Sequence, residues 1–241
     1  MNVSAIRDWA DAARRTPLSD GAALEAWHLL SPRCRFIKTL PTHAAVLDVG
    51  AGDGSLQIYR RWPAPKRTDL AMYTFALARG ALFDQYQGYE LGAWPQGKPD
   101  FGGTLFDAIV AANFIEHIDA PTDFIGWAAS RLTRRGGIFL EWPAEVSLDL
   151  PTADELRAVG VDVMTGNYFD DATHRRELPQ TKAVHDALRD AGLRIDEAGT
   201  VRLPFLHDHL MAIGKSEGDI VPRTLAYWSF TGWCQYVIAR R

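Results

Sequence analysis

Three glycines at alternate positions, Gly50, Gly52 and Gly54, come directly after a short apolar run. That run, residues 44–49, reads Ala-Ala-Val-Leu-Asp-Val and predicts a buried β-strand. Glycine lets the backbone turn sharply and approach a ligand where any Cβ would clash. The amides that open the following helix attract anionic groups. The sequence therefore predicts a small-molecule site at the end of a buried strand.

Two nucleotide-binding patterns fit this chain less well. A dinucleotide site prefers G-x-G-x-x-G, and Ser55 stands where that pattern requires its last glycine. The tripeptide Gly214-Lys215-Ser216 matches the tail of a phosphate-binding loop, but His209 occupies the position of the leading glycine. A dehydrogenase and a phosphate-loop kinase are therefore both disfavoured.

The glycine loop needs a sheet to position it, and the sequence supplies further elements. Buried strands are predicted over residues 106–112 and 137–141. Between them a helix begins at Pro121 and is expected to end at Gly136-Gly137. Strand, helix and strand within about 35 residues predict a right-handed parallel crossover.

Helices and late strands are expected on both sides of this core. They are two amphipathic helices before residue 44, a helix over 181–191, strands over 193–203 and 233–239, and an inserted cap over 204–231.

The segment Val46-Leu47-Asp48-Val49-Gly50-Ala51-Gly52-Asp53-Gly54 resembles motif I of the class I S-adenosylmethionine-dependent methyltransferases. In that family the loop cradles the amino-acid end of the cofactor, and Asp48 matches the acid that helps to hold its ammonium. Asp69 lies 21 residues after Asp48, near the expected end of the second strand, and resembles the ribose-binding carboxylate. A surface or capping acid is the alternative for Asp69.

The resemblance continues downstream over roughly residues 44–143. The segment from Phe106 to Val110, followed by Glu116-His117-Ile118, is similar to the family's fourth strand, and residues 132–137 resemble its "L-x-P-G-G" turn. The third-strand segment has Glu90 but lacks the usual adenine-binding acid. The cofactor-binding residues that the resemblance implies are Asp48, Gly50, Ala51, Gly52, Gly54, Asp69, Leu70 and Asn113.

This resemblance implies a fold and a division of the chain. We expect an α/β fold with a Rossmann-like, doubly wound, seven-stranded and mostly parallel sheet, an N-terminal helical cap and an insertion before the last strand. Residues 1–43 would form the cap and 44–241 the methyltransferase domain. Within that domain, 44–143 would form the cofactor core and 144–232 the acceptor-side and cap segments.

The polar segment from Asn167 to His174 is the second concentration of reactive side chains. It loosely resembles a stretch in methyltransferases that act on sugars. His174 is a candidate general base for a hydroxyl acceptor, oriented by Asp170 or Asp171, because imidazole titrates near neutral pH. His117 is a second catalytic candidate, with helix capping as its alternative.

A metal site is a competing use of the same residues. Glu116, His117 and His174 offer one carboxylate and two imidazoles, a plausible mixed set for a divalent cation such as Mg²⁺ that binds acceptor hydroxyls. A capped loop without catalytic function is the third alternative.

Composition and charge narrow the class of acceptor. The 241 residues carry 26 Lys+Arg and 30 Asp+Glu, a net charge of −4, with 47% hydrophobic and 23% charged residues. Such a chain is globular, and it lacks the concentrated basic surface of a nucleic-acid domain. Two distant cysteines, with no secretory or membrane-spanning segment, favour the cytoplasm.

The preferred reaction is O-methylation of a sugar or polar small metabolite. N-methylation of a small amine, RNA 2′-O-methylation and a non-catalytic cofactor-binding module are the alternatives, and a homodimer stays open.

Overall fold

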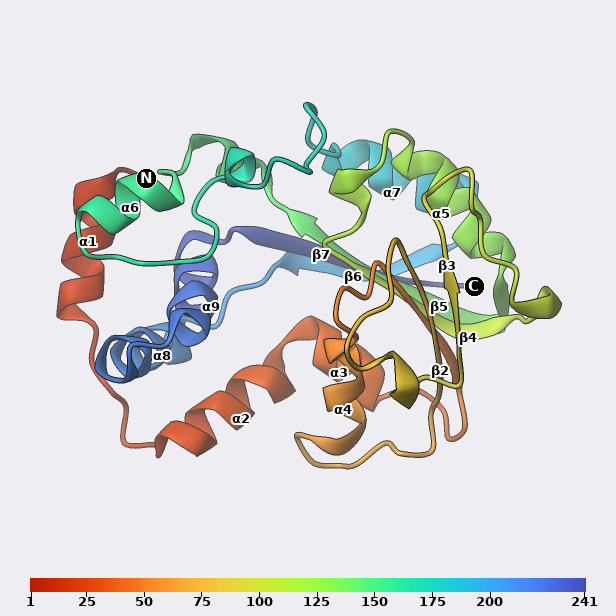
Figure 1. Cartoon of the computed structure of the whole chain (residues 1–241), viewed down its shortest axis with the longest axis horizontal. Coiled ribbons are helices and arrows are strands. Elements are labelled where there is room, and N and C mark those ends of the chain that lie inside the picture. The colour runs from red at the N-terminus through yellow and green to blue at the C-terminus, as the bar shows by residue number, and fades with distance from the viewer. The chain divides into compact units, whose positions relative to one another are not determined.

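The computed structural model describes all 241 residues, whose elements are labelled in Figure 1. The strands are β1 (Ala45–Val49), β2 (Ala71–Ala76), β3 (Gly88–Leu91), β4 (Phe106–Ala112), β5 (Leu132–Pro143), β6 (Arg194–Thr200) and β7 (Cys234–Arg240). The α-helices are α1 (Val3–Ala12), α2 (Asp20–Leu30), α3 (Pro32–Lys38), α4 (Ile58–Arg61), α5 (Pro121–Ser130), α6 (Ala153–Ala158), α7 (Thr181–Asp190), α8 (Pro204–Glu217) and α9 (Ile220–Thr231). Short 3₁₀ turns are η1 (Ser55–Gln57), η2 (Phe83–Gln85), η3 (Phe101–Gly103), η4 (Ile115–His117), η5 (Glu145–Asp149) and η6 (Tyr168–Asp170).

The seven strands form one sheet in the order β3-β2-β1-β4-β5-β7-β6. β1 pairs in parallel with β2 on one side and with β4 on the other. β2 with β3 and β4 with β5 are also parallel. The predicted Rossmann-like, mostly parallel seven-stranded fold is confirmed, with α8 and α9 inserted before the last strand. The strand order reverses between β1 and β4, the place where open α/β sheets bind ligands.

The chain divides into two compact units. The sheet unit contains Pro32–Trp142, Arg175–Gly199 and Tyr236–Arg241. The helical unit, described separately below, contains the remaining three segments, which are Met1–Ser31, Pro143–His174 and Thr200–Gln235. In the sheet unit, α5 and α7 lie on one face of the sheet and α3 and α4 on the other (Figure 1). Layers on both faces explain why strands such as β4 read as continuous apolar runs.

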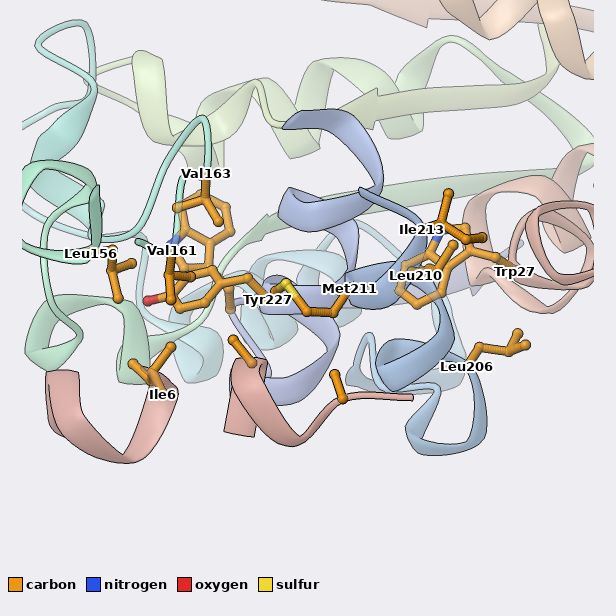
Figure 2. Packing of buried hydrophobic residues seen from close by; sticks show 14 of the residues in the cluster. Ile6, Trp27, Leu156, Val161, Val163, Leu206, Leu210, Met211, Ile213 and Tyr227 are labelled. Carbon is orange, nitrogen blue, oxygen red and sulfur yellow. The ribbon is translucent and has the colours of Figure 1, made fainter. Parts of the chain in front are cut away.

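The helical unit has its own apolar core, shown in Figure 2. Ile6 of α1, Trp27 of α2, Leu156 of α6, Leu210 of α8 and Tyr227 of α9 are all buried in it. The two amphipathic helices expected before residue 44 correspond to α1 and α2, whereas the third helix before that residue, α3 of the sheet unit, was not predicted. The proposed domain boundary at residue 43 stays a prediction.

One predicted boundary was wrong, at the end of α5. The helix ends at Ser130 rather than at the glycine pair, and Gly136-Gly137 lies inside β5. The pairing of β4 with β5 is irregular here, since Phe106 faces Leu132 whereas Ala108 faces Gly137. A Cβ on Gly136 would lie 2.9 Å from the Phe106 carbonyl oxygen, so the glycine permits a close approach inside a strand rather than a turn.

No helix of the chain combines the length and the apolar character needed to cross a membrane.

Candidate functional site

The glycine loop follows β1 at the carboxyl edge of the sheet. Gly50, Gly52 and Gly54 have φ values of +75°, +56° and +92°. Residues that carry a Cβ are strained in this left-handed region of the backbone. A Cβ on Gly50 would lie 2.8 Å from Cδ2 of Phe114, so the loop contacts the segment that follows β4. A Cβ on Gly52 would meet no atom within 4 Å. The loop therefore leaves open space directly above Gly52, with no side chain of its own to fill it.

Asp48, the acid predicted to hold the cofactor's ammonium, lies near the end of β1 and is only 5% exposed. Burial raises the pKa of its carboxyl group to about 7. The hydroxyl of Tyr86 donates a hydrogen bond to Oδ2 at 2.5 Å, and this bond lowers the pKa, as does the positive charge of Arg33. Arg33, from α3, also forms an ion pair with the buried Glu141 of β5. A carboxylate and a guanidinium thus lie together at this edge.

Asn113 immediately follows β4, the strand beside β1. It adopts a left-handed backbone conformation with φ of +51°, and its amide donates to the Glu141 carbonyl at 2.8 Å. Its side-chain Oδ1 is buried and has no hydrogen-bond partner. A buried acceptor without a partner costs free energy, so Asn113 is suited to receive a hydrogen bond from a bound ligand.

A segment that sequence reasoning missed packs against the glycine loop. Residues 77–87 join β2 to β3, and a Cβ on Gly80 would lie only 2.3 Å from the Gly52 carbonyl oxygen. The Leu82 amide donates to the Asp53 carbonyl at 2.8 Å. The shape of the glycine loop is therefore set partly by a neighbouring connection, which the one-dimensional motif does not reveal.

Asp69 does not lie where the sequence analysis placed it. β2 begins at Ala71 and pairs there with Ala45, the first residue of β1, so Asp69 precedes the strand at the edge opposite the glycine loop. Its carboxylate accepts hydrogen bonds from the Arg67 guanidinium at 3.0 Å and from the His43 amide at 3.0 Å. These bonds hold the pKa of Asp69 well below its usual range, the Arg67 bond contributing most. These contacts agree with the alternative of a surface or capping acid for Asp69.

Leu70 shares this location, because it is buried just before β2. The predicted cofactor contacts of Asp69 and Leu70 are both inconsistent with their place in the sheet. The residues after β2 are Leu77, which is 78% exposed, and Ala78, neither of which is an acid.

Glu90, on the third strand, has a structural role. Its carboxylate accepts hydrogen bonds from the amides of Asp100 at 2.9 Å and Phe101 at 2.6 Å. It therefore caps the connection to β4, which agrees with the absence of an adenine-binding acid on this strand.

Glu116 and His117 lie in η4, just beyond Asn113 in the sheet unit. The Glu116 side chain is fully buried, and its backbone carbonyl accepts a hydrogen bond from the Arg175 amide at 2.8 Å. The Arg175 guanidinium pairs with Asp119 at 2.9 Å. These contacts fix the backbone of the segment that carries both predicted residues.

His174 belongs to the helical unit, so the three predicted metal ligands are shared between units that are described separately. Its Nδ1 lies 2.6 Å from the Tyr168 carbonyl oxygen, and its Nε2 lies 3.9 Å from Asp171 Oδ2. Asp170 is otherwise engaged, because its Oδ2 accepts three backbone amide bonds, from Ala153, Gly166 and Asn167. Of the two acids predicted to orient His174, Asp171 is the one in reach.

Comparison with known proteins assigns the family. The family described as "Methyltransferase domain" matches residues 23–198 of this sequence. The chain belongs to this methyltransferase family. The methyltransferase is 28% identical over 205 residues to the ubiquinone biosynthesis O-methyltransferase of Xanthomonas axonopodis pv. citri (strain 306), a match covering 82% of this chain and 83% of that protein.

Solved structures share the fold of the methyltransferase. A protein assigned as a sarcosine dimethylglycine methyltransferase from Galdieria sulphuraria is 15% identical with a TM-score of 0.55, covering 95% of this chain and 90% of its own. The cyclopropane synthase MmaA2 of Mycobacterium tuberculosis is 16% identical with a TM-score of 0.53, covering 97% and 98%. The methyltransferase is thus a class I, S-adenosylmethionine-dependent enzyme.

The residues around the glycine loop fit the amino-acid end of that cofactor. Asp48 offers an anion for the ammonium group, and Arg33, which sequence analysis missed, offers a cation for the carboxylate. Gly52 has no side chain, which leaves space for the cofactor to approach the backbone of the loop. Asn113 offers its buried Oδ1 as a hydrogen-bond acceptor. At the ribose end the fit is incomplete, since the residues directly after β2, Leu77 and Ala78, are not acids.

Proposed function

We propose that this methyltransferase transfers a methyl group to a hydroxyl oxygen of a small polar acceptor. The observation that carries the proposal is the hydrogen bond between His174 and the Tyr168 carbonyl. A carbonyl oxygen only accepts hydrogen bonds, so Nδ1 must carry the proton and Nε2 the lone pair of the neutral ring. His174 is thereby prepared in the tautomer of a general base.

Hydroxyl methylation makes use of such a base. The cofactor supplies an electrophilic methyl group on a sulfonium. Nε2 of His174 would take up the proton that the acceptor hydroxyl gives up on methylation, and Asp171 would stabilise the resulting imidazolium. An amine attacks in its neutral form and can release its proton to water afterwards, so it depends less on a positioned base.

The relationship to the ubiquinone biosynthesis O-methyltransferase supports oxygen as the methylated atom and a small molecule as the acceptor. The sugar acceptor suggested by residues 167–174 is a narrower version of the proposal. In this chain Asn167 and Asp170 mainly serve the backbone, since Asn167 Oδ1 accepts from the Phe169 amide at 2.9 Å. The sugar version therefore draws its support from His174 and Asp171.

The experiment supplies S-adenosylmethionine labelled in its methyl group with three acceptors tested separately: a catechol, a hexose and a small secondary amine. Product masses and the labelled position identify the methylated atom. We expect O-methylated product from at least one hydroxyl acceptor. Label transferred only to the amine would overturn the proposal.

The base is tested by His174→Gln, with His185→Gln on α7 as the matched control. Loss of a general base lowers kcat by roughly 100-fold or more, while the dissociation constant of S-adenosylhomocysteine should not change. The same measurement on His117→Gln decides whether His117 is a second acid–base residue.

The divalent cation stays a prediction, with Glu116, His117 and His174 as its ligands. Chelation by EDTA followed by re-addition of Mg²⁺ tests it. Activity that chelation leaves unchanged would contradict the metal site and leave the proposed general base intact.

A further inference from the structure

Tyr86 and Asp48 form a buried side-chain pair beside the glycine loop. Tyr86 precedes β3, and its hydroxyl donates to Asp48 Oδ2 at 2.5 Å. No other hydrogen bond of the chain engages the Asp48 carboxylate, so Oδ1 is left for a ligand. We propose that Tyr86 is a positioning residue that holds Asp48 as an anion oriented to receive the ammonium group of the cofactor. This role does not depend on the identity of the acceptor.

The surroundings of Asp48 show why such help is needed. Burial favours the neutral acid and is the largest influence on its pKa, raising it to about 7. Tyr86, from the β2–β3 connection, and Arg33, from α3, oppose that effect, whereas Asp53 in the glycine loop adds to it. Of the two opposing groups Tyr86 has the larger influence. Without its hydroxyl, a larger fraction of Asp48 would be protonated at neutral pH and would not attract a cation.

The ring of Tyr86 has a separate structural role. Its Cε2 atom lies 3.1 Å from where a Cβ on Gly54 would stand, and the ring contacts Phe83 edge to face. The substitution Tyr86→Phe keeps this ring and removes only the hydroxyl, so it separates the electrostatic role from packing.

The test measures the dissociation constant of S-adenosylhomocysteine by calorimetry from pH 6 to pH 9 for the wild type and Tyr86→Phe. The amino group of the ligand titrates identically in both series, so the ratio of the two constants reports on the protein alone. If the pKa of Asp48 rises by about one unit, the variant binds about tenfold more weakly at pH 6 and nearly as well at pH 9. Tyr89→Phe, an exposed tyrosine of the same unit, is the control and should give a ratio near one throughout.

Two results would overturn the proposal. One is a ratio above one that does not change with pH, which indicates a purely structural role. The other is a ratio of one at every pH, which indicates no role in binding. A double variant tests directly whether Tyr86 acts through Asp48, and thermal unfolding checks that each variant is folded. In an Asp48→Asn background, which has no carboxylate to hold, adding Tyr86→Phe should not weaken binding further, and any additional loss would show that Tyr86 acts through something other than Asp48.

Discussion

Gly80 and Gly52 meet backbone to backbone, although they lie in connections that follow different strands. A Cβ on Gly80 would stand 2.3 Å from the Gly52 carbonyl oxygen and 2.7 Å from the Asp53 Cα. No side chain fits at such distances, and the atoms in the way are backbone atoms that cannot rotate aside. The connection after β2 thus packs directly against the backbone of the glycine loop and helps to fix its conformation.

The substitution Gly80→Ala should therefore displace the glycine loop. We expect S-adenosylhomocysteine binding to weaken at least tenfold and the free energy of unfolding to fall by about 1–3 kcal/mol, the usual cost of overpacking. Calorimetry and urea titration measure both quantities. Gly126→Ala is the control, because Gly126 lies in helix α5 with no atom near its missing Cβ, and there alanine should be neutral or slightly stabilising.

Gly52→Val should remove cofactor binding without unfolding the chain. The valine side chain would occupy the space above the loop through which the cofactor approaches the protein backbone. The positive φ of +56° adds strain on the order of 1–2 kcal/mol. Gly160→Val matches that strain, because Gly160 also has a positive φ and open surroundings but lies in the helical unit. Equal cofactor binding by Gly52→Val and the wild type would show that this loop is not the site.

Asp48→Asn should stabilise the protein at alkaline pH while it weakens cofactor binding. The folded-state pKa of Asp48, about 7, is above the value in the unfolded chain, so protonation favours the folded state at low pH and this stability is lost as pH rises through 7. Asparagine has no charge to bury. The variant's free energy of unfolding should exceed that of the wild type by on the order of 2 kcal/mol at pH 8. The difference should shrink as pH falls toward 5, and thermal unfolding at both values checks the trend.

Asp69→Asn should affect stability but not cofactor binding. The pKa of Asp69 is lowered in the folded state, chiefly by Arg67, so its stabilising effect is present above about pH 4 and is lost as pH falls further. We expect a lower melting temperature at pH 7 and a gap that closes in acid. Weakened S-adenosylhomocysteine binding in a folded variant would instead restore the ribose-binding role that the sequence suggested.

The elements that sequence reasoning predicted well are those whose signals are local. The apolar run of β4 predicts where that strand begins and ends. The periodicity of α7 and the Gly192 that follows it predict the bounds of that helix. The glycine motif likewise predicted that Asp48 lies near the end of a strand and beside the glycine loop, because the strand, the acid and the loop are consecutive in the chain.

The errors and omissions concern relationships across the sheet. Asp69 was misplaced because the start of β2 is decided by its pairing with β1, which spacing from Asp48 does not reveal. Arg33, Gly80 and Tyr86 were missed because each reaches the site from another connection or helix, and their residue types have no distinctive local pattern. Gly80 offered the only signal, a glycine between two expected strands, and that signal is too common to identify a contact.

The helical unit is assembled from three separate stretches, the last ending at Gln235, and the sheet unit still needs Tyr236–Arg241. During synthesis the glycine loop leaves the ribosome well before residues 200–235, which complete the helical unit, and residues 236–241, which the sheet unit needs. Domains generally fold as whole units, so cofactor binding should be acquired only after residues 236–241 have been synthesised. Until then the apolar faces of α1 and α2 have no α8 or α9 to pack against and stay exposed to water.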